Sequence, residues 1–150
     1  MATFPTGVSV VTTGRAGEGV WGLTCSSVAS VSVEPPTLLV CLRRGSKTLD
    51  PLLRIGTFAV NLLHGGGRPA AELFASSAAD RFGRVEWELD PSFGGPHLVA
   101  DAHSIADCRV ARTLQVGDHT VVFGEVYRVT QDAAEEAGPL LYGMRRFGEF

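Results

Sequence analysis

Two long β-type runs near the C-terminus constrain the fold more than any other feature. Ile105–Val116 and His119–Thr130 are separated only by Gly117-Asp118. A two-residue Gly-Asp connection favours a tight hairpin turn between two strands. A chain of 150 residues is the size of one domain, so we expect a single core over residues 1–150 that includes this hairpin.

Shorter β-branched runs, bounded by turn residues, predict further strands. They are Gly7–Thr13, Val20–Cys25, Val28–Val33, Leu38–Leu42 and Thr57–Leu63. Glycines at 14–19 predict a turn between the first two, and Pro35-Pro36 predicts a strand end. Two helices are expected, Lys47–Ile55 with Ser46 as its cap and Gly56 as its end, and Pro69–Ser76. Many strands with two helices predict a mainly β protein, an antiparallel β-barrel with helices outside it.

Charge and hydropathy exclude two classes of partner. The 13 basic and 16 acidic side chains give a net charge of −3 without a long basic cluster, which argues against nucleic-acid binding. No apolar run approaches the ~20 residues that cross a bilayer, so we expect a cytoplasmic protein with no membrane contact. Charged residues make up only 19% of the chain, which hints at a buried surface between subunits.

Metal and disulfide chemistry also find no support in the sequence. The three cysteines, Cys25, Cys41 and Cys108, are far apart, and no CxxC occurs. The four histidines are scattered, without zinc-ligand spacing. Residues 45–48 lack the Gly-Lys adjacency of a phosphate loop, and the glycines at 14–19 lack the GxGxxG spacing of a dinucleotide fold.

A strip of small hydroxyl residues interleaves with apolar ones between Gly22 and Ser32. Its hydroxyl members are Thr24, Ser26, Ser27, Ser30 and Ser32. Hydroxyl groups both donate and accept hydrogen bonds, and their small size lets backbone N–H groups approach a ring closely. The strip therefore suits a planar polar ring. An edge strand with outward polar residues has the same composition, and both interpretations stay open.

Two other features could bind charged ligands. Arg43-Arg44-Gly45-Ser46-Lys47-Thr48 joins a strand end to a helix start, where free N–H groups and cations bind phosphate. The alternative is a helix cap with solvated basic residues. His119 follows the turn of the long hairpin, and strand alternation puts Val121 and Phe123 on its face. An exposed turn histidine is also often inert.

Taken in order, these segments resemble the flavin reductase-like family, the FMN-binding split-barrel proteins that include the reductase components of two-component flavin monooxygenases. The resemblance covers nearly the whole chain. It rests on Phe4–Thr13, Gly22–Ser27 with Ser30–Ser32, Pro35-Pro36, Ser46–Thr48, Phe58–Leu62, Arg81-Phe82 with Trp87, and Gly117–His119.

This resemblance implies a homodimeric split β-barrel of Greek-key type. It would bind FMN or FAD at the dimer interface, reduce it with NADH or NADPH and supply the reduced flavin to a separate monooxygenase. The residues implied at the flavin ring are Thr24, Cys25, Ser26 and Ser27, with Ser30, Val31 and Ser32 close by. Those implied at the ribityl chain and phosphate are Arg43, Ser46, Lys47 and Thr48.

The resemblance further implies that His119 lies beside the nicotinamide, and that Arg81 and Phe82 belong to a loop near the flavin. Hydride transfer needs two stacked rings more than an acid or base, because the cofactors do the chemistry. We therefore expect His119, the candidate catalytic residue, to position and polarise the nicotinamide amide.

Two departures from the family pattern leave the choice between FMN and FAD open. Ser26 stands where the family often has Asn, and Arg43 where it often has an acidic residue. The nicotinamide preference is open too, with Arg15, Arg68 and Arg84 as candidate cations for a 2′-phosphate. Two alternative functions remain, namely a flavoprotein that keeps its flavin and acts on a small organic substrate, and a non-enzymatic flavin-binding barrel.

Overall fold

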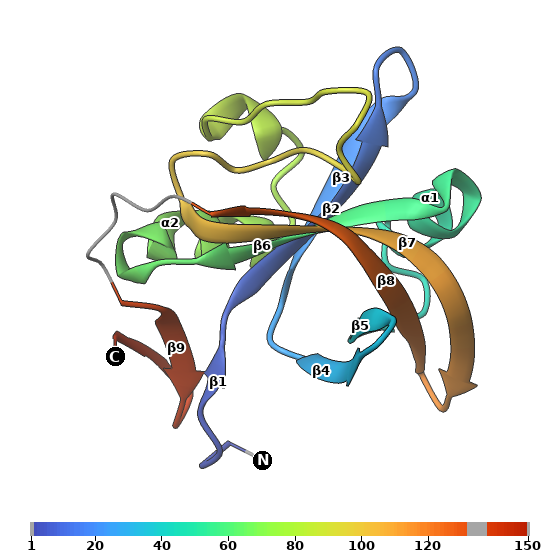
Figure 1. The fold of residues 1–150 in the computed structure, drawn as a ribbon. Helices are drawn as coiled ribbons and strands as arrows, with labels where there is room; N and C mark the ends of the chain where they lie inside the picture. Colours follow the sequence, from blue (N-terminus) through green and yellow to red (C-terminus); the bar gives the residue numbers. More distant parts are fainter. Residues whose placement is uncertain (1, 132–137, 150) are drawn as a thin grey trace.

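A large antiparallel sheet dominates the computed structural model, which describes residues 2–131 and 138–149 (Figure 1). Its seven strands run in the order β3-β2-β6-β7-β8-β5-β4. They are β2 (Ser9–Arg15), β3 (Gly19–Cys25), β4 (Val28–Val33), β5 (Pro36–Arg43), β6 (Thr57–Leu63), β7 (Ala102–Val116) and β8 (His119–Gln131). Every strand expected from the sequence is present, with ends that differ by a few residues at most.

The long hairpin forms as predicted. β7 and β8 pair from Ser104↔Gln131 to Val116↔His119. Gly117 has a φ of +56°, a value that a tight two-residue turn requires and that glycine adopts without strain. β5 pairs with the other side of β8, so that Arg43 lies directly opposite His119.

The sheet curls so that its two ends approach each other. β3 leads through residues 26–27 into β4, and the N–H of Cys41 on β5 donates to the carbonyl of Ser27 at 3.1 Å. Both helices lie outside this curl, α1 (Leu49–Ile55) against β2 and α2 (Arg68–Ala75) against β3. The predicted class, mainly β with a barrel and flanking helices, is confirmed.

Helix α1 begins two residues later than expected. Thr48 occupies the N-cap position and makes no capping bond with its side chain, while the Ser46 hydroxyl accepts from the N–H of Leu49 at 3.3 Å. Gly56 ends the helix with a φ of +80°, as predicted. Helix α2 lies one residue earlier than expected at each end, with Pro69 in its first turn.

The sequence did not predict a second, three-stranded sheet. β1 (Thr6–Gly7) pairs with β9 (Leu140–Gly143), which pairs with β10 (Arg146–Glu149). These strands are too short for a periodic pattern to stand out. Two short 3₁₀ turns, η1 (Gly65–Gly67) and η2 (Phe82–Arg84), complete the described elements.

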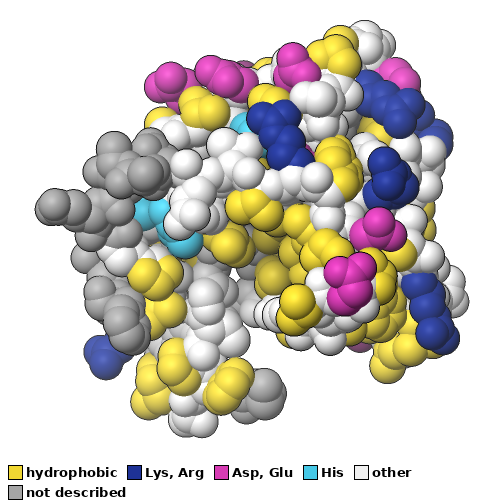
Figure 2. All heavy atoms as spheres, viewed as in Figure 1, with side chains coloured by type: hydrophobic (Ala, Val, Ile, Leu, Met, Phe, Trp, Pro, Cys, Tyr) yellow, Lys and Arg dark blue, Asp and Glu magenta, His cyan; other side chains and the backbone are white. Residues whose placement is uncertain are grey.

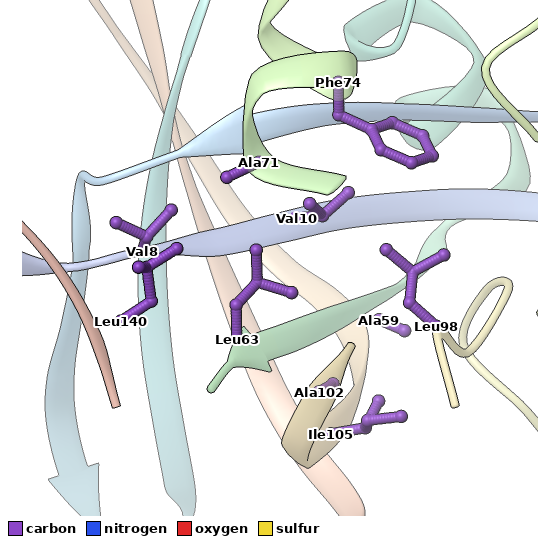
Figure 3. Close-up of a cluster of buried hydrophobic side chains, with 10 residues drawn as sticks. All are labelled: Val8, Val10, Ala59, Leu63, Ala71, Phe74, Leu98, Ala102, Ile105 and Leu140. Atoms are coloured by element: carbon purple, nitrogen blue, oxygen red, sulfur yellow. The ribbon is translucent and has the colours of Figure 1, made fainter. Parts of the chain in front are cut away.

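Buried apolar side chains form two clusters. Figure 3 shows the first, in which Phe74 and Ala71 of α2 face side chains of β2 and β6, and Leu140 of β9 joins from the second sheet. The second cluster lies between β5, β6, β8 and α1, around Phe58, Leu42 and Leu52. Together the clusters fix both helices and the small sheet on the large one.

Residues 93–98 cross β2 and β6 in close contact. A Cβ on Gly94 would collide with the carbonyl of Phe58, so no larger residue fits there. The Thr12 hydroxyl donates to the Pro96 carbonyl at 2.6 Å, and the N–H of Leu98 donates to Oδ1 of Asn61 at 2.8 Å. This loop is therefore held by polar groups that are themselves buried.

Within the described residues, no helix is long and apolar enough to span a membrane.

Candidate functional site

Ser26 and Ser27 form an exposed corner between β3 and β4, which we call the serine corner. Within the described part of the chain, neither hydroxyl has a hydrogen-bond partner. Thr24 differs, because its hydroxyl donates to the Ala71 carbonyl at 2.6 Å. The Ser32 hydroxyl donates to the Glu34 carbonyl at 3.1 Å. The predicted hydroxyl strip thus divides into groups used by the fold and groups free for a ligand.

A hollow of about 550 Å³ opens beside the serine corner. We call it the hairpin hollow, because the β9–β10 hairpin forms one wall. Figure 2 shows the surface hollowed here, between the part that carries β1 and β9 and the part that carries β4 and β5, with hydrophobic side chains in view. Its lining includes Phe4, Ser26, Ser27, Leu39, Cys41, Tyr142 and Arg145. Apolar walls with a polar corner suit a flat ring that has one polar edge.

A second hollow, of about 400 Å³, lies next to the first. Both are lined by Ser26 and Tyr142. The second also reaches Thr24, Glu72 and Phe147, so it extends towards α2. Two ligands could therefore meet at Ser26 from different sides.

Ser30 and Ser32 do not line either of these hollows. They line an apolar hollow of about 300 Å³ formed by residues of β4, β5, β6, β7 and β8, among them Leu62 and Val126. Val31, between them, is 47% exposed on the edge strand β4. Strand alternation explains this arrangement, because successive side chains point to opposite faces. The strip therefore divides in space, with Ser26 and Ser27 at the hairpin hollow and Ser30 and Ser32 on the edge strand β4.

Arg43 lies two residues beyond Cys41 on the same face of β5. It lines a further hollow of about 710 Å³, together with Arg44, Gly45 and Asp118. Lys47 is exposed and Ser46 is half-buried beside it. Thr48 is only 2% exposed and lies beneath this surface. The cationic end of β5 thus continues the face that starts at the hairpin hollow.

His119 stands at the same edge as Arg43. The N–H of Arg44 donates to the Asp118 carbonyl at 2.9 Å, which ties the hairpin turn to the end of β5. Nδ1 of His119 lies 2.9 Å from Oδ1 of Asp118. This hydrogen bond, followed by the charge of His119, lowers the pKa of the Asp118 carboxyl. A carboxylate only accepts, so Nδ1 carries the proton and Nε2 is left for a ligand.

Arg81 and Phe82 both contact Phe74, near the C-terminal end of α2. The Arg81 guanidinium donates to the Phe74 carbonyl at 3.0 Å and packs over the Phe74 ring. Phe82 contacts Phe74 and Trp87 edge to face, at 5.0 and 5.4 Å between ring centres. These two residues therefore support the end of α2, next to Ser76 in the second hollow.

Cys25 is buried, and that burial raises the pKa of its thiol. Its Sγ lies 3.9 Å from the Cys41 carbonyl oxygen. Cys25 therefore contributes its backbone and its packing to the corner, and not a reactive thiolate.

We did not predict from the sequence the wall formed by Tyr142, Gly143 and Arg145. The one available indication was the Arg145-Arg146 pair, which composition alone did not connect to the serine corner. The contact depends on the pairing of β9 with β1, which brings residues far apart in the chain together.

Known flavin reductases resemble this chain in sequence and in fold. The model of the flavin reductase like domain matches residues 1–150. The chain belongs to this family. A flavin reductase (NADPH) of Lentzea aerocolonigenes is 50% identical over 147 residues, which cover 98% of this chain and 84% of that protein.

Solved structures of flavin reductases share the fold. The NADH:FAD oxidoreductase of Streptomyces globisporus, in complex with NAD and FAD fragments, has a TM-score of 0.90 and 36% identity, covering 99% of this chain and 87% of that one. The styrene monooxygenase flavin reductase of Pseudomonas putida S12 has a TM-score of 0.87 and 30% identity, covering 99% and 93%. The family, the split-barrel fold and the resemblance inferred from the sequence are thus confirmed.

Proposed function

We propose that this protein is an NAD(P)H-dependent flavin reductase that reduces FMN or FAD by hydride transfer and supplies it to a separate monooxygenase. The observation that carries the proposal is the serine corner, whose free hydroxyls face the hairpin hollow in a chain of the flavin reductase family. Relatives named for NADPH- and NADH-dependent flavin reduction, and for styrene monooxygenase, support it.

The hairpin hollow fits a flavin ring. Leu39 and Phe4 offer apolar contact to the ring faces, and Ser26 and Ser27 offer donors and acceptors to its polar edge. Thr24 and Cys25 hold the backbone of the corner through buried contacts. A bound flavin supplies the hydride acceptor, and the protein supplies donors that stabilise negative charge on the reduced ring.

The end of β5 fits the phosphate of that flavin. Arg43 lies on the face of β5 that Cys41 shares, and we assign Ser46 and Lys47, three and four residues further along the chain, to the same phosphate region. Thr48 belongs to this group through its backbone, because its side chain is buried. In this assignment Ser30, Val31 and Ser32 shape the edge strand beyond the ring, and Arg81 and Phe82 support α2.

His119 is assigned to the nicotinamide. Its side chain is 45% exposed, and Asp118 holds its ring by Nδ1. Nε2 is therefore free to hydrogen-bond an amide and orient the ring for transfer. This role needs no proton exchange during the reaction, so His119 acts by position and polarity.

We further propose a homodimer. The outer face of the β5–β7–β8 sheet carries half-exposed or exposed apolar residues in register, Leu39 opposite Phe123 and Leu114 opposite Val121. Val116, opposite His119, is 55% exposed. A second copy on this face would bury apolar side chains next to the candidate catalytic residue. Leu114→Glu would place a charge in this interface. We expect this variant to be a monomer on size-exclusion chromatography with light scattering.

A crossed steady-state assay tests the function. NADH and NADPH are each oxidised in air with FMN, FAD or riboflavin added, and we expect the rate to rise with added flavin for at least one pair. Dialysis before the assay separates a flavin substrate from a tightly held flavin. Oxidation that does not respond to any added flavin would overturn the proposal.

A further inference from the structure

The turn of the β9–β10 hairpin carries a charged side chain into the candidate site. Arg145 lines the hairpin hollow together with Ser26, Ser27 and Tyr142. Arg146, its neighbour, does not line this hollow; it pairs with Gly143 in the hairpin. The two adjacent arginines therefore differ in what they face.

The hairpin that presents Arg145 is firmly braced. Tyr142 and Phe147 contact each other edge to face, with 5.1 Å between ring centres. Phe147 packs against the first core cluster, and the Arg68 guanidinium lies over its ring at 5.4 Å. Leu140, at the start of β9, is only 1% exposed. A braced turn holds a side chain in place before a ligand arrives, which lowers the entropic cost of binding.

The backbone of this turn is unusual. Met144 and Arg145 have φ values of +52° and +59°, a region that long L side chains rarely adopt. Asn-Gly is the common choice where both central residues need positive φ. Two long side chains kept in this conformation point to a role for at least one of them. Of the two, only Arg145 lines the hairpin hollow, and its guanidinium is charged.

Among the described residues, no acidic side chain compensates the charge of Arg145. No acidic side chain lines the hairpin hollow, and no ion pair joins Arg145 to any residue in the described ranges. Glu72, in the adjoining hollow, already pairs with Arg68 at 2.8 Å. A guanidinium that faces an apolar hollow without a partner favours an anionic ligand group.

Arg145 thus lines the hairpin hollow itself, whereas Arg43 lies two residues beyond Cys41 on β5 and lines a different hollow. If Arg43 and its neighbours hold the flavin phosphate, Arg145 is left for the second phosphorylated substrate. We propose that Arg145 binds a phosphate group of the nicotinamide dinucleotide. This inference rests on the proposed function and adds the residue that recognises the hydride donor.

The phosphate could be the diphosphate bridge, present in both NADH and NADPH, or the 2′-phosphate, present in NADPH alone. Both phosphate groups would bind a guanidinium in the same way, but substitution of Arg145 would affect the two dinucleotides differently. Loss of a bridge contact weakens both dinucleotides, whereas loss of a 2′-phosphate contact weakens only NADPH. None of the three arginines first considered for the 2′-phosphate lines the hairpin hollow. Arg15 donates to the Ile55 carbonyl, and Arg68 pairs with Glu72.

The test compares Arg145→Gln with Arg146→Gln, which removes the same charge from the same turn. KM is measured for NADH and NADPH at saturating flavin, and for flavin at saturating dinucleotide. We expect Arg145→Gln to raise KM for at least one dinucleotide about tenfold or more, as for the loss of a charged hydrogen bond. KM for flavin should rise less than KM for the dinucleotide, Arg146→Gln should match the wild type, and Arg145→Lys should recover part of the loss.

A dinucleotide KM that stays at the wild-type value in Arg145→Gln would overturn the inference, and so would a rise confined to flavin. An equal rise in Arg146→Gln would also overturn it, because a general field effect would then explain the result. Thermal unfolding of each variant separates binding from loss of fold. A wild-type protein with no flavin-dependent oxidation would instead refute the proposed function.

Discussion

Two polar regions of this molecule differ in whether their side chains find hydrogen-bond partners within the fold. The serine corner is exposed, and its hydroxyls have no partner within the described ranges. The second region, a buried polar anchor made of Thr12, Asn61, His97 and Asp107, is at most 2% exposed, and its side chains bond the loop at 93–98 to the sheet. A polar group with its partner inside the fold supports structure, and one without a partner is available for a ligand.

The anchor centres on Asp107. Its Oδ1 accepts from the N–H of Gly94 at 2.7 Å and lies 2.8 Å from Nε2 of His97. Its Oδ2 has no hydrogen bond, although Nε of Arg128 lies 3.8 Å away, within ion-pair distance. Phe93 stacks on the His97 ring at 3.7 Å, and Arg128 covers Phe93. Removing the carboxylate would leave a histidine and an N–H buried without a partner.

The largest expected effect is therefore on stability. Asp107→Ala should lower the free energy of unfolding by about 3 kcal/mol or more, because the buried N–H of Gly94 and the buried His97 ring both lose their partner. Urea unfolding followed by circular dichroism measures it. Asp90→Ala, an exposed carboxylate in the same loop region, is the matched control. A loss below about 1 kcal/mol, as for an exposed ion pair, would show that the anchor does not hold the loop.

A change at the open site should act on turnover instead. His119→Ala should lower kcat about tenfold, which is 1.4 kcal/mol of barrier, while flavin affinity and stability stay close to wild type. Stopped-flow reduction and a flavin titration separate the two quantities. If the variant loses flavin but keeps its rate per bound flavin, His119 belongs to the flavin site and our assignment is wrong.

Ser26 and Ser9 differ in burial and in whether their hydroxyls have a partner within the fold. Ser26 is exposed in the hollow, whereas the Ser9 hydroxyl is buried and donates to the Cys25 carbonyl at 2.8 Å. Ser26→Ala should weaken flavin binding about fivefold, as expected for one net hydrogen bond near 1 kcal/mol, without loss of stability. Ser9→Ala should lower stability by a similar free energy and weaken flavin binding less than Ser26→Ala does. The reverse pattern would exchange the roles we assign to the two serines.

The smallest expected effect concerns the thiols. Burial, with the Asp107 charge, raises the pKa of Cys108 to about 12, so this thiol stays protonated and unreactive at about pH 8. Burial also raises the pKa of the Cys25 thiol, which makes it less reactive. Cys41 is half-buried and lines the hairpin hollow, so a thiol reagent should modify it first and flavin should slow the reaction. Mass spectrometry identifies the labelled residue; labelling of Cys108 before Cys41 would contradict the assignment.

The large sheet was predictable because its strands are long or bounded by clear turns. The hairpin at Gly117-Asp118 and the run Val28–Val33 appear as expected. The pairing of β5 with β8 places Arg43 directly opposite His119. No local pattern in the sequence predicts this pairing. The local sequence pattern thus predicts the strands, but strand pairing in the folded sheet determines which residues become neighbours.

The small sheet and the buried anchor were not predictable in this way. β9 and β10 are four residues each and contain glycines, so no periodicity marks them. Asp107 sits in a strand of otherwise β-type residues and meets His97 only through a loop contact. As a result the sequence indicated the serine strip but not the wall that faces it, nor that Ser30 and Ser32 turn to another hollow.

We propose that the open serine corner binds a flavin, which accepts hydride from a nicotinamide dinucleotide. Anaerobic titration of the protein with one equivalent of FMN or FAD, followed by stepwise addition of NADH or NADPH, tests it directly through the visible flavin absorbance. We predict that the absorbance bleaches in proportion to the dinucleotide added, and much more slowly with His119→Ala. A flavin that binds but stays oxidised with both dinucleotides would contradict the account.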